Sequence, residues 1–420
     1  MNRLFERVDW SVNANIYEVN LRQYSQEGTF TSFIRELPRL KDMGITILWF
    51  MPITPISFEK RLGSLGSYYA CSCYLQTNPE YGTIQDFKQL VRSIHDLGMK
   101  VIIDWVANHT GWDHEWTRTH PAYYKRNDQG SFYDNHNWAD VIDLNYYDQL
   151  MRKEMVSSMA FWINECGIDG FRCDMAHLVP LDFWRDARDT LDQIKPLFWL
   201  GETEEYNYQA VFDCSYAWSW MHMSVNYVRG GAGIEELKAL LGSYQQNIQA
   251  FASYLFFTTN HDENSWNGTE YEKYGDATLA MAVLSCMWNG DALVYSGQEL
   301  PNRRRLKFFD KDVIEWKDRY ELHGFYKTLL QTRISFGTSI PLIDILQTGS
   351  DTQVIAFRRT SPEKELLVVI NLSGSAKHLQ LDQGSLKGSY TDLMTGTKKE
   401  APSLNNLLME PWTYLILVNR

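Results

Sequence analysis

The sequence predicts a (β/α)₈ TIM barrel with one short insertion after the third strand and a C-terminal antiparallel β-sandwich. Three observations support this fold class: a repeated helix–glycine–strand pattern, one segment that interrupts it, and a change to short strands near the C-terminus. We place the barrel in residues 1–107 and 146–337, the insertion in 108–145 and the sandwich in 338–420. A doubly wound open sheet is the alternative arrangement of the same βα units.

One local pattern recurs in the first half of the chain, where the end of a helix is joined to an apolar strand through a glycine. It occurs around Gly44, Gly98 and Gly167. Glycine suits this position because it adopts the left-handed backbone that closes a helix without steric cost. The apolar runs that follow, such as VIID, are typical of buried parallel strands. Further apolar runs count towards eight strands: 16–19, 198–200, 254–257 and 292–295.

Two regions depart from this pattern. Residues 108–143 are polar and aromatic and longer than most βα loops, which predicts an insertion after the third strand. After about residue 338, the runs VIAFRR, LLVVINL, HLQL and TYLILV alternate with turn residues. Short strands separated by turns predict the C-terminal antiparallel sandwich.

The composition argues against several classes of protein. The chain has 420 residues and is 44% hydrophobic, which suffices for a large core and argues against global disorder. The net charge of −12 argues against a nucleic-acid partner, because phosphate binding requires clustered Lys and Arg. No stretch approaches the roughly 18 apolar residues of a membrane span. The 14% aromatic content favours a sugar-binding groove only slightly, since large cores also collect aromatic residues.

The six cysteines form no Cys-x-x-Cys pair and show no zinc-site spacing. Cys71 and Cys73 lie one residue apart on an extended segment, so their side chains point to opposite faces and cannot hold one ion together. The pattern predicts buried thiols in a reducing compartment. Because MNRLFERVDW contains no apolar signal region, we expect a cytoplasmic location. A secreted or periplasmic protein whose signal had been removed is the alternative.

Four carboxylates directly follow predicted strands: Asp104, Asp174, Glu202 and Asp262. The first interval, 70 residues, fits one βα unit plus the insertion. The second, 28 residues, fits one βα unit, and the third, 60 residues, fits two. In a barrel the C-terminal ends of the strands meet at one mouth, so these side chains are expected to converge. Converging like charges are costly and serve metal binding or acid–base chemistry. Glycoside hydrolysis needs such a pair, one group as nucleophile and the other as protonated acid.

Four motifs around these carboxylates resemble those of the α-amylase family, glycoside hydrolase family 13. They are DWVANHT (104–110), GFRCDMAH (170–177), GETEE (201–205) and FFTTNHDENSW (256–266). Each motif alone is a weak signal, but four in the right order and spacing are specific. Supporting stretches such as VIDLN (141–145) extend the resemblance over nearly the whole chain.

The resemblance implies a retaining hydrolase that cleaves α-1,4-glucosidic bonds of starch or maltodextrins through a covalent glycosyl-enzyme intermediate. It also implies three catalytic residues. Asp174 would attack the anomeric carbon, and Glu202 would protonate the leaving oxygen and then deprotonate water. Asp262 would bind sugar hydroxyls and help to distort the ring.

The resemblance further implies five substrate-binding positions. His109 and His261 would hydrogen-bond the reacting sugar, and Tyr69 aligns with a tyrosine that commonly stacks on it. Arg172 would orient the nucleophile and keep it ionised, while Asp104 would support the site rather than react. Four aromatic residues near the motifs are candidates for sugar stacking or for packing: Trp112, Trp138, Tyr206 and Trp266.

The chain departs from the family pattern at two positions. Cys73 stands where many members have Asp. Leu178 stands where many α-amylases have a His whose backbone carbonyl helps to hold a structural calcium, with Asn108 as another ligand. Calcium at Asn108 is therefore an open expectation, and no organic cofactor is expected.

Two alternatives to an α-glucan hydrolase stay open. One is an α-glucosidase or a glucosyl transferase of the same fold, such as a trehalose-forming relative. The other is a non-catalytic glycan-binding subunit, which is disfavoured because such proteins usually lose catalytic acids and this chain keeps all three. Neither endo or exo action nor the oligomeric state follows from the sequence.

Overall fold

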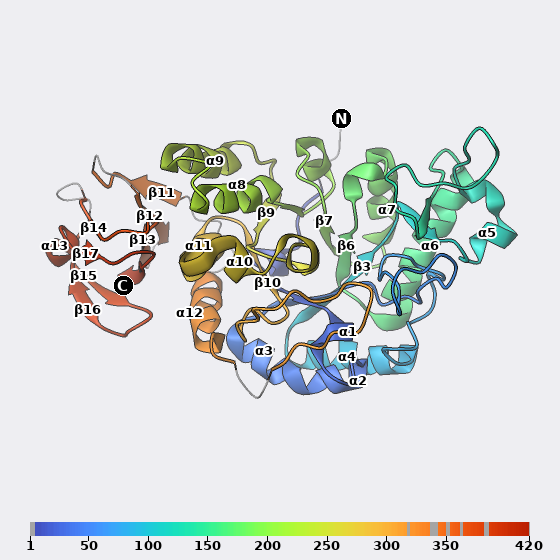
Figure 1. Ribbon diagram of the computed structural model, residues 1–420, viewed down its shortest axis with the longest axis horizontal. Helices are drawn as coiled ribbons and strands as arrows, with labels where there is room; N and C mark the ends of the chain where they lie inside the picture. The colour runs from blue at the N-terminus through green and yellow to red at the C-terminus, as the bar shows by residue number, and fades with distance from the viewer. Residues whose placement is uncertain are drawn as a thin grey trace.

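The computed structural model describes residues 5–316, 320–336, 343–349, 353–361, 364–381 and 386–419. Its centre is a closed barrel of parallel strands in the order β1-β10-β9-β8-β7-β6-β3-β2 (Figure 1). The strands are β1 Asn15–Val19, β2 Ile47–Phe50, β3 Lys100–Trp105, β6 Gly170–Cys173, β7 Phe198–Gly201, β8 Cys214–Tyr216, β9 Ser253–Phe256 and β10 Asp291–Tyr295. The predicted barrel is confirmed, and its closure through the β1–β10 pair excludes the open sheet.

Helices surround the barrel (Figure 1). The longer ones are α3 Leu37–Met43, α4 Ile84–Asp96, α6 Gln149–Cys166, α7 Leu181–Leu191, α8 Trp218–Val228, α9 Ile234–Gln246, α11 Thr278–Met287 and α12 His323–Ile334. Shorter ones are α1 Leu21–Tyr24, α2 Phe30–Phe33 and α10 Glu270–Tyr274. Helix α4 shows how the sequence sets such an element: Thr83 and Asp86 form a capping box at its start, and its apolar stripe packs into the core.

Glycines end the helices that lead into β2, β3 and β6. Gly44 and Gly167 are C-caps with φ of 96° and 71°, and Gly98, with φ of 70°, follows directly after the cap of α4. Gly170, at the start of β6, is required for a steric reason: a Cβ there would lie 2.0 Å from the carbonyl oxygen of Phe198. Close contact of β6 with β7 therefore depends on a residue without a side chain.

The insertion follows β3. It contains the two-stranded antiparallel pair of β4 His109–Gly111 and β5 Val141–Asp143, and the short helix α5 Trp116–Thr119. His109 pairs with Asp143, so the two ends of the insertion lie side by side at the barrel. The exact boundaries at 108 and 145 stay predictions.

The C-terminal region forms a six-stranded antiparallel sheet in the order β11-β12-β13-β18-β15-β16. Its strands are β11 Ile343–Leu346, β12 Val354–Ser361, β13 Lys364–Asn371, β18 Tyr414–Asn419, β15 Ser389–Asp392 and β16 Lys398–Glu400. A second pair, β14 Lys377–His378 with β17 Leu408–Met409, and helix α13 Ala401–Leu404 complete it. Trp288 stacks edge-on against Phe357 at 5.1 Å, which joins the sheet to the barrel. The predicted boundary at 338 lies outside the described residues.

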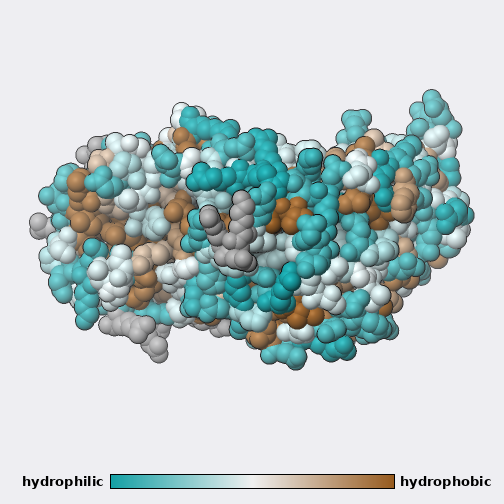
Figure 2. Space-filling view, turned by 60° about the horizontal axis from the view of Figure 1, so that its bottom comes forward, coloured by the Kyte–Doolittle hydropathy of each residue, from teal (hydrophilic) through white to brown (hydrophobic). Residues whose placement is uncertain are grey.

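The surface is mostly polar on the face shown in Figure 2, where hydrophobic residues form several separate patches. Among the described residues, no helix is long and apolar enough to cross a membrane. One barrel strand, β8, did not stand out in the sequence, because three residues are too few to show a periodic pattern.

Candidate active site

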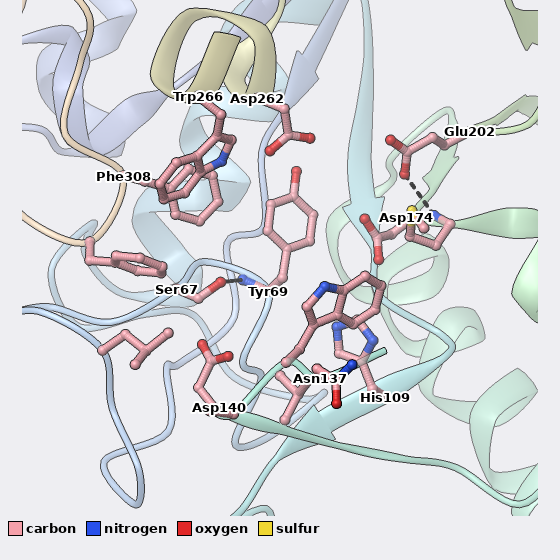
Figure 3. Close-up of a pocket in the computed structure, with 16 residues that line it drawn as sticks. Ser67, Tyr69, His109, Asn137, Asp140, Asp174, Glu202, Asp262, Trp266 and Phe308 are labelled. Carbon is pink, nitrogen blue, oxygen red and sulfur yellow. Dashed lines mark hydrogen bonds between the residues drawn. The ribbon is translucent and has the colours of Figure 1, made fainter. Parts of the chain in front are cut away.

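The predicted site residues meet at the C-terminal ends of the barrel strands. Asp104 lies in β3, Asp174 directly follows β6, and Glu202 directly follows β7. Asp262 follows β9, and Tyr69 lies in the loop after β2. Here the structure holds a cavity of about 390 Å³ (Figure 3). Convergence of side chains from five different units is the arrangement that barrel enzymes use for chemistry.

The cavity brings the three predicted catalytic carboxylates together. Asp174 and Glu202 lie on one side of it and Asp262 on the other, with Tyr69 between them (Figure 3). His109 also lines the wall. Asp104, Arg172 and His261 do not line the cavity; they lie beneath its floor and are at most 4% exposed. Their predicted contact with a substrate stays a prediction. Arg172 contacts two lining carboxylates and His261 contacts the third, while Asp104 reaches the cavity lining through the Tyr69 hydroxyl.

One buried arginine organises the carboxylates. The Arg172 Nη1 atom donates to Asp104 Oδ1 at 2.9 Å and to Asp174 Oδ1 at 3.0 Å, and Nη2 lies 2.9 Å from Glu202 Oε2. Its Nε donates to the Tyr216 hydroxyl at 3.1 Å. The guanidinium is fully buried, so three carboxylates share one fixed positive charge. Such fork-shaped contacts fix orientation as well as charge.

Asp174 and Glu202 both contact Arg172, and the charge of Glu202 acts on Asp174. Burial and the neighbouring charge of Glu202 raise the pKa of Asp174 well above its usual value. The hydrogen bond from Arg172 acts in the opposite direction and favours the ionised carboxylate. Two carboxylates held beside one arginine, one of them with a raised pKa, are the kind of pair that acid–base chemistry uses.

Met175 was missed by the sequence analysis. Its backbone has φ of 40° and ψ of 47°, in the left-handed region that residues other than glycine rarely adopt. In this conformation its N–H donates to Glu202 Oε2 at 2.7 Å (Figure 3). A strained residue directly after Asp174 therefore positions the Glu202 carboxylate. No sequence signal reports a backbone dihedral of this kind at a methionine.

Asp262 is held in its charged form. Burial alone would raise the pKa of Asp262, but the positive charge and hydrogen bond of His261 outweigh it and lower that pKa. The His261 Nε2 atom lies 3.2 Å from Asp262 Oδ2. An ionised carboxylate in the cavity can accept hydrogen bonds from two sugar hydroxyls.

Tyr69 presents a ring at the centre of the cavity (Figure 3). Its hydroxyl donates to Asp104 Oδ2 at 3.1 Å and lies 2.7 Å from His261 Nε2. Gly66, three residues before Tyr69, has φ of 78° and would place a Cβ 2.8 Å from Ile56, so glycine is required there. The phenol is thus fixed at its far end, which suits a platform for a sugar ring.

An aromatic wall closes one side of the cavity: Trp266, Phe308 and Phe309. The Phe308 ring lies nearly parallel to that of Tyr69, with centroids 6.3 Å apart. Trp138 from the insertion also lines the cavity and contacts His109 edge-on at 5.4 Å. Of the four aromatics singled out in the sequence, Trp138 and Trp266 reach the cavity, and Trp112 and Tyr206 do not line it. Phe308 and Phe309 were missed because they follow a basic run rather than a motif.

His109 is a neutral histidine. The Asn108 side-chain amide donates to its Nδ1 at 3.2 Å, which leaves Nε2–H as the donor available to a ligand. Burial lowers the pKa of His109 to about 4. His114, in the same insertion, is also buried, and burial lowers its pKa to about 3. Both rings therefore stay uncharged at neutral pH.

These two histidines predict acid sensitivity. In the unfolded chain they bind protons below about pH 6.5, whereas in the folded protein they do so only near pH 4 and pH 3. The free energy of unfolding should therefore fall as the pH drops from 6.5 to 4, by about 3 kcal/mol from His109 alone. Urea unfolding at several pH values measures this slope. His114→Asn should flatten it and His120→Asn, at an exposed position, should leave it unchanged; equal slopes in all three proteins would contradict the expectation.

The donor set at Asn108 does not fit calcium. The neighbouring carboxylate, Asp143, is fully buried and is bonded at Oδ2 by the Lys125 ammonium at 3.0 Å and the Asn135 amide at 2.9 Å. Its Oδ1 lacks a partner among the described residues, but the positive charge is already supplied by Lys125. The His177 carbonyl accepts from the Tyr208 hydroxyl at 3.2 Å. Calcium needs six to eight oxygens, and the described residues contain no group of three His, Cys, Asp or Glu arranged for a metal.

The six cysteines are free thiols. Cys71 is buried and Cys73 is partly buried, and burial together with the charge of Glu115 raises the pKa of the Cys73 thiol. The carboxylates that contact Arg172 are Asp104, Asp174 and Glu202, which come from β3 and from the loops after β6 and β7 rather than from the segment of Cys73.

A barrel whose mouth holds a buried arginine, two carboxylates in contact with it and a third, ionised carboxylate has the architecture that glycoside hydrolases use. The family described as "Alpha amylase, catalytic domain" matches residues 11–141 and 121–318, and "Alpha-amylase SusG C-terminal domain" matches residues 354–416. The chain belongs to the α-amylase family.

Individual relatives agree with this assignment. The chain is 26% identical to alpha-amylase MalA of Haloarcula japonica over 95% of its own length and 61% of that protein. It is 25% identical to alpha-amylase 3 of Dictyoglomus thermophilum over 87% of its own length and 85% of that protein. Among solved structures, an alpha-amylase from Lactobacillus plantarum matches with a TM-score of 0.87 and 27% sequence identity. The match covers 98% of this chain and 100% of that one. The noncanonic maltogenic alpha-amylase AmyB of Thermotoga neapolitana matches with a TM-score of 0.88 and 27% sequence identity. The match covers 97% of this chain and 98% of that one.

Proposed function

We propose that this protein is a retaining α-glucan hydrolase that cleaves α-1,4-glucosidic bonds of starch or maltodextrins. The observation that carries the proposal is the Arg172-centred pair of Asp174 and Glu202 at the wall of a cavity that also presents Tyr69 and Asp262. Relatives named alpha-amylase over most of the chain support the substrate class.

The geometry performs the reaction in two steps. A glucosyl ring packs on Tyr69, and Asp262 accepts hydrogen bonds from its hydroxyls. Asp174 attacks the anomeric carbon while Glu202 gives its proton to the leaving oxygen, so that a glycosyl ester forms and the sugar bond breaks. Glu202 then takes a proton from water, whose oxygen attacks the same carbon and releases Asp174. Two inversions give net retention.

The test incubates the protein with soluble starch, maltoheptaose and maltose and follows the products by chromatography and by ¹H NMR of the fresh anomeric proton. Shortened maltodextrins with α configuration are expected. A β-configured first product would contradict the retaining mechanism, and inactivity on all three substrates would contradict the substrate class. Glucose as the sole product would indicate an α-glucosidase, and longer transfer products at low substrate would indicate a transferase, as in the cyclomaltodextrin glucanotransferase among the relatives.

We also propose that no calcium is needed at Asn108, because Lys125 supplies the positive charge beside Asp143. Dialysis against EDTA is expected to leave the melting temperature unchanged. Lys125→Met is expected to lower the free energy of unfolding by about 2 kcal/mol, because it leaves a buried carboxylate without its cation. The control Lys88→Met removes a surface pair with the half-exposed Glu165 and should cost under about 1 kcal/mol. A large loss of melting temperature in EDTA that added calcium restores would overturn the proposal.

A cytoplasmic location is likewise a proposal, supported by the six free thiols.

A further inference from the structure

Glu18 is a buried carboxylate that the proposed reaction does not use. It lies in β1, faces the barrel interior and is 0% exposed. A carboxylate removed from water is costly unless it is paired and hydrogen-bonded. Its position in the strand therefore requires a specific partner.

That partner is His261. The Glu18 Oε1 atom lies 2.5 Å from His261 Nδ1 and 3.4 Å from the backbone N–H of the same residue. The second oxygen, Oε2, is buried and has no hydrogen-bond partner within the part of the chain that the structure describes. The two residues are 243 positions apart in the sequence, and barrel closure brings them together.

The opposite side of the His261 ring faces the cavity. Its Nε2 lies 3.2 Å from Asp262 Oδ2 and 2.7 Å from the Tyr69 hydroxyl, and both of those residues line the cavity. The imidazole thus connects Glu18, below the floor, to two groups that face the substrate. The charged and titratable groups around the pair come from several elements: Glu18, Tyr69, Asp104, Arg172, Tyr216, Asp262 and Tyr295.

The hydrogen bonds assign the protons on His261. Asp104 Oδ2 accepts from the Trp49 indole at 3.2 Å and from the Tyr69 hydroxyl at 3.1 Å. Because the one proton of Tyr69 is directed at Asp104, the phenol oxygen is the acceptor in its contact with His261 Nε2. The Nε2 atom therefore carries a proton, and Nδ1, facing a carboxylate at 2.5 Å, carries the other.

We propose that Glu18 is a positioning residue, which holds His261 as a doubly protonated imidazolium so that Asp262 and Tyr69 are locked in the geometry that receives the sugar. Glu18 touches neither the substrate nor the reacting atoms and acts only through the imidazole. The role in catalysis rests on the proposed function, whereas the proton count on His261 does not.

The electrostatics agree with the geometry. Burial alone would lower the pKa of His261, but Asp262 and then Glu18 raise it well above its usual value. A group of this kind is charged below its raised pKa and loses its proton only when the pH rises through it. Removal of the Glu18 charge should therefore lower the pH at which the imidazolium is lost.

Glu18→Gln tests the proposal, because the amide keeps an oxygen facing Nδ1–H but removes the charge. The alkaline limb of kcat/KM is expected to move down by at least about one pH unit, so that activity at high pH falls roughly tenfold while activity near pH 5.5 stays within about threefold. The matched control is Glu299→Gln, which neutralises another fully buried carboxylate, bonded to Tyr17 at 2.7 Å and Arg39 at 3.0 Å. It should leave the pH profile unchanged.

The second readout does not depend on activity. Protein labelled with ¹³C at histidine Cε1 is titrated by NMR, and His261→Gln assigns the signal. In the wild type the signal is expected to keep its imidazolium shift through neutral pH, and in Glu18→Gln it should titrate at lower pH. The proposal would be overturned if Glu18→Gln kept both the wild-type pH profile of kcat/KM and the wild-type titration of His261. It would also be overturned if the variant lost activity equally at every pH while the His261 titration stayed unchanged. Failure of the glucan assay alone would contradict the proposed function and leave the titration as the test of Glu18.

Discussion

Replacement of Asp174 by Asn is expected to lower kcat on maltoheptaose by roughly 10⁴-fold or more, because the amide cannot form the glycosyl ester and removal of a covalent nucleophile has effects of this size. The fold should survive. Burial and Glu202 raise the pKa of Asp174, which means that folding disfavours its charged form. A neutral amide removes that penalty, so the free energy of unfolding should stay the same or rise.

Steady-state kinetics and thermal unfolding of the purified variant measure both effects. Asp140→Asn is the matched control, because Asp140 also lines the cavity but is not bonded to Arg172. Its kcat should fall by less than about tenfold, since it contributes at most to binding. Near wild-type activity in Asp174→Asn would remove the nucleophile assignment, and a collapsed melting temperature would show that the residue is structural.

Replacement of Arg172 by Met is expected to have the largest combined effect on stability and activity. The guanidinium is the shared partner of Asp104, Asp174 and Glu202, and all of these groups are buried. Without it, uncompensated charges remain in the core, which typically costs about 3–5 kcal/mol. Arg172→Lys should recover part of the stability but little activity, because one ammonium cannot reach three carboxylates in a fixed geometry.

A buried arginine of a different kind provides the control. Arg359 is 0% exposed, but it lies 3.5 Å from the Met287 carbonyl and 3.4 Å from Asn13 Oδ1 rather than beside carboxylates. Burial lowers its pKa to about 9, so its charge is poorly compensated. Arg359→Met should therefore cost less than about 2 kcal/mol and leave kcat unchanged. Equal losses of stability in the two methionine variants would show that Arg172 acts by packing alone.

The sequence predicts the parts of this molecule that depend on local pattern. Helix-ending glycines and apolar runs predict the βα units, and closure of the barrel places the carboxylates that end those strands at one mouth. The order and spacing of the predicted strands were thus enough to predict that three carboxylates meet in one cavity: Asp174, Glu202 and Asp262.

What the sequence could not show depends on dihedral angles and on distant pairing. The left-handed backbone of Met175 has no residue signature. Glu18 meets His261 only because β1 closes the barrel against β10, whose other neighbour is β9, the strand that precedes His261. The Lys125–Asp143 pair forms within an insertion whose path no periodicity describes.

The most direct test of the retaining mechanism is to trap the intermediate. Glu202→Gln is incubated with α-maltosyl fluoride, whose fluoride leaves without a proton, so the first step proceeds while the second lacks its base. Mass spectrometry of the intact protein should show one added maltosyl group, and peptide mapping should place it on Asp174. An adduct on another residue, or β-maltose released with no adduct at any time, would contradict the assignment of Asp174 as nucleophile.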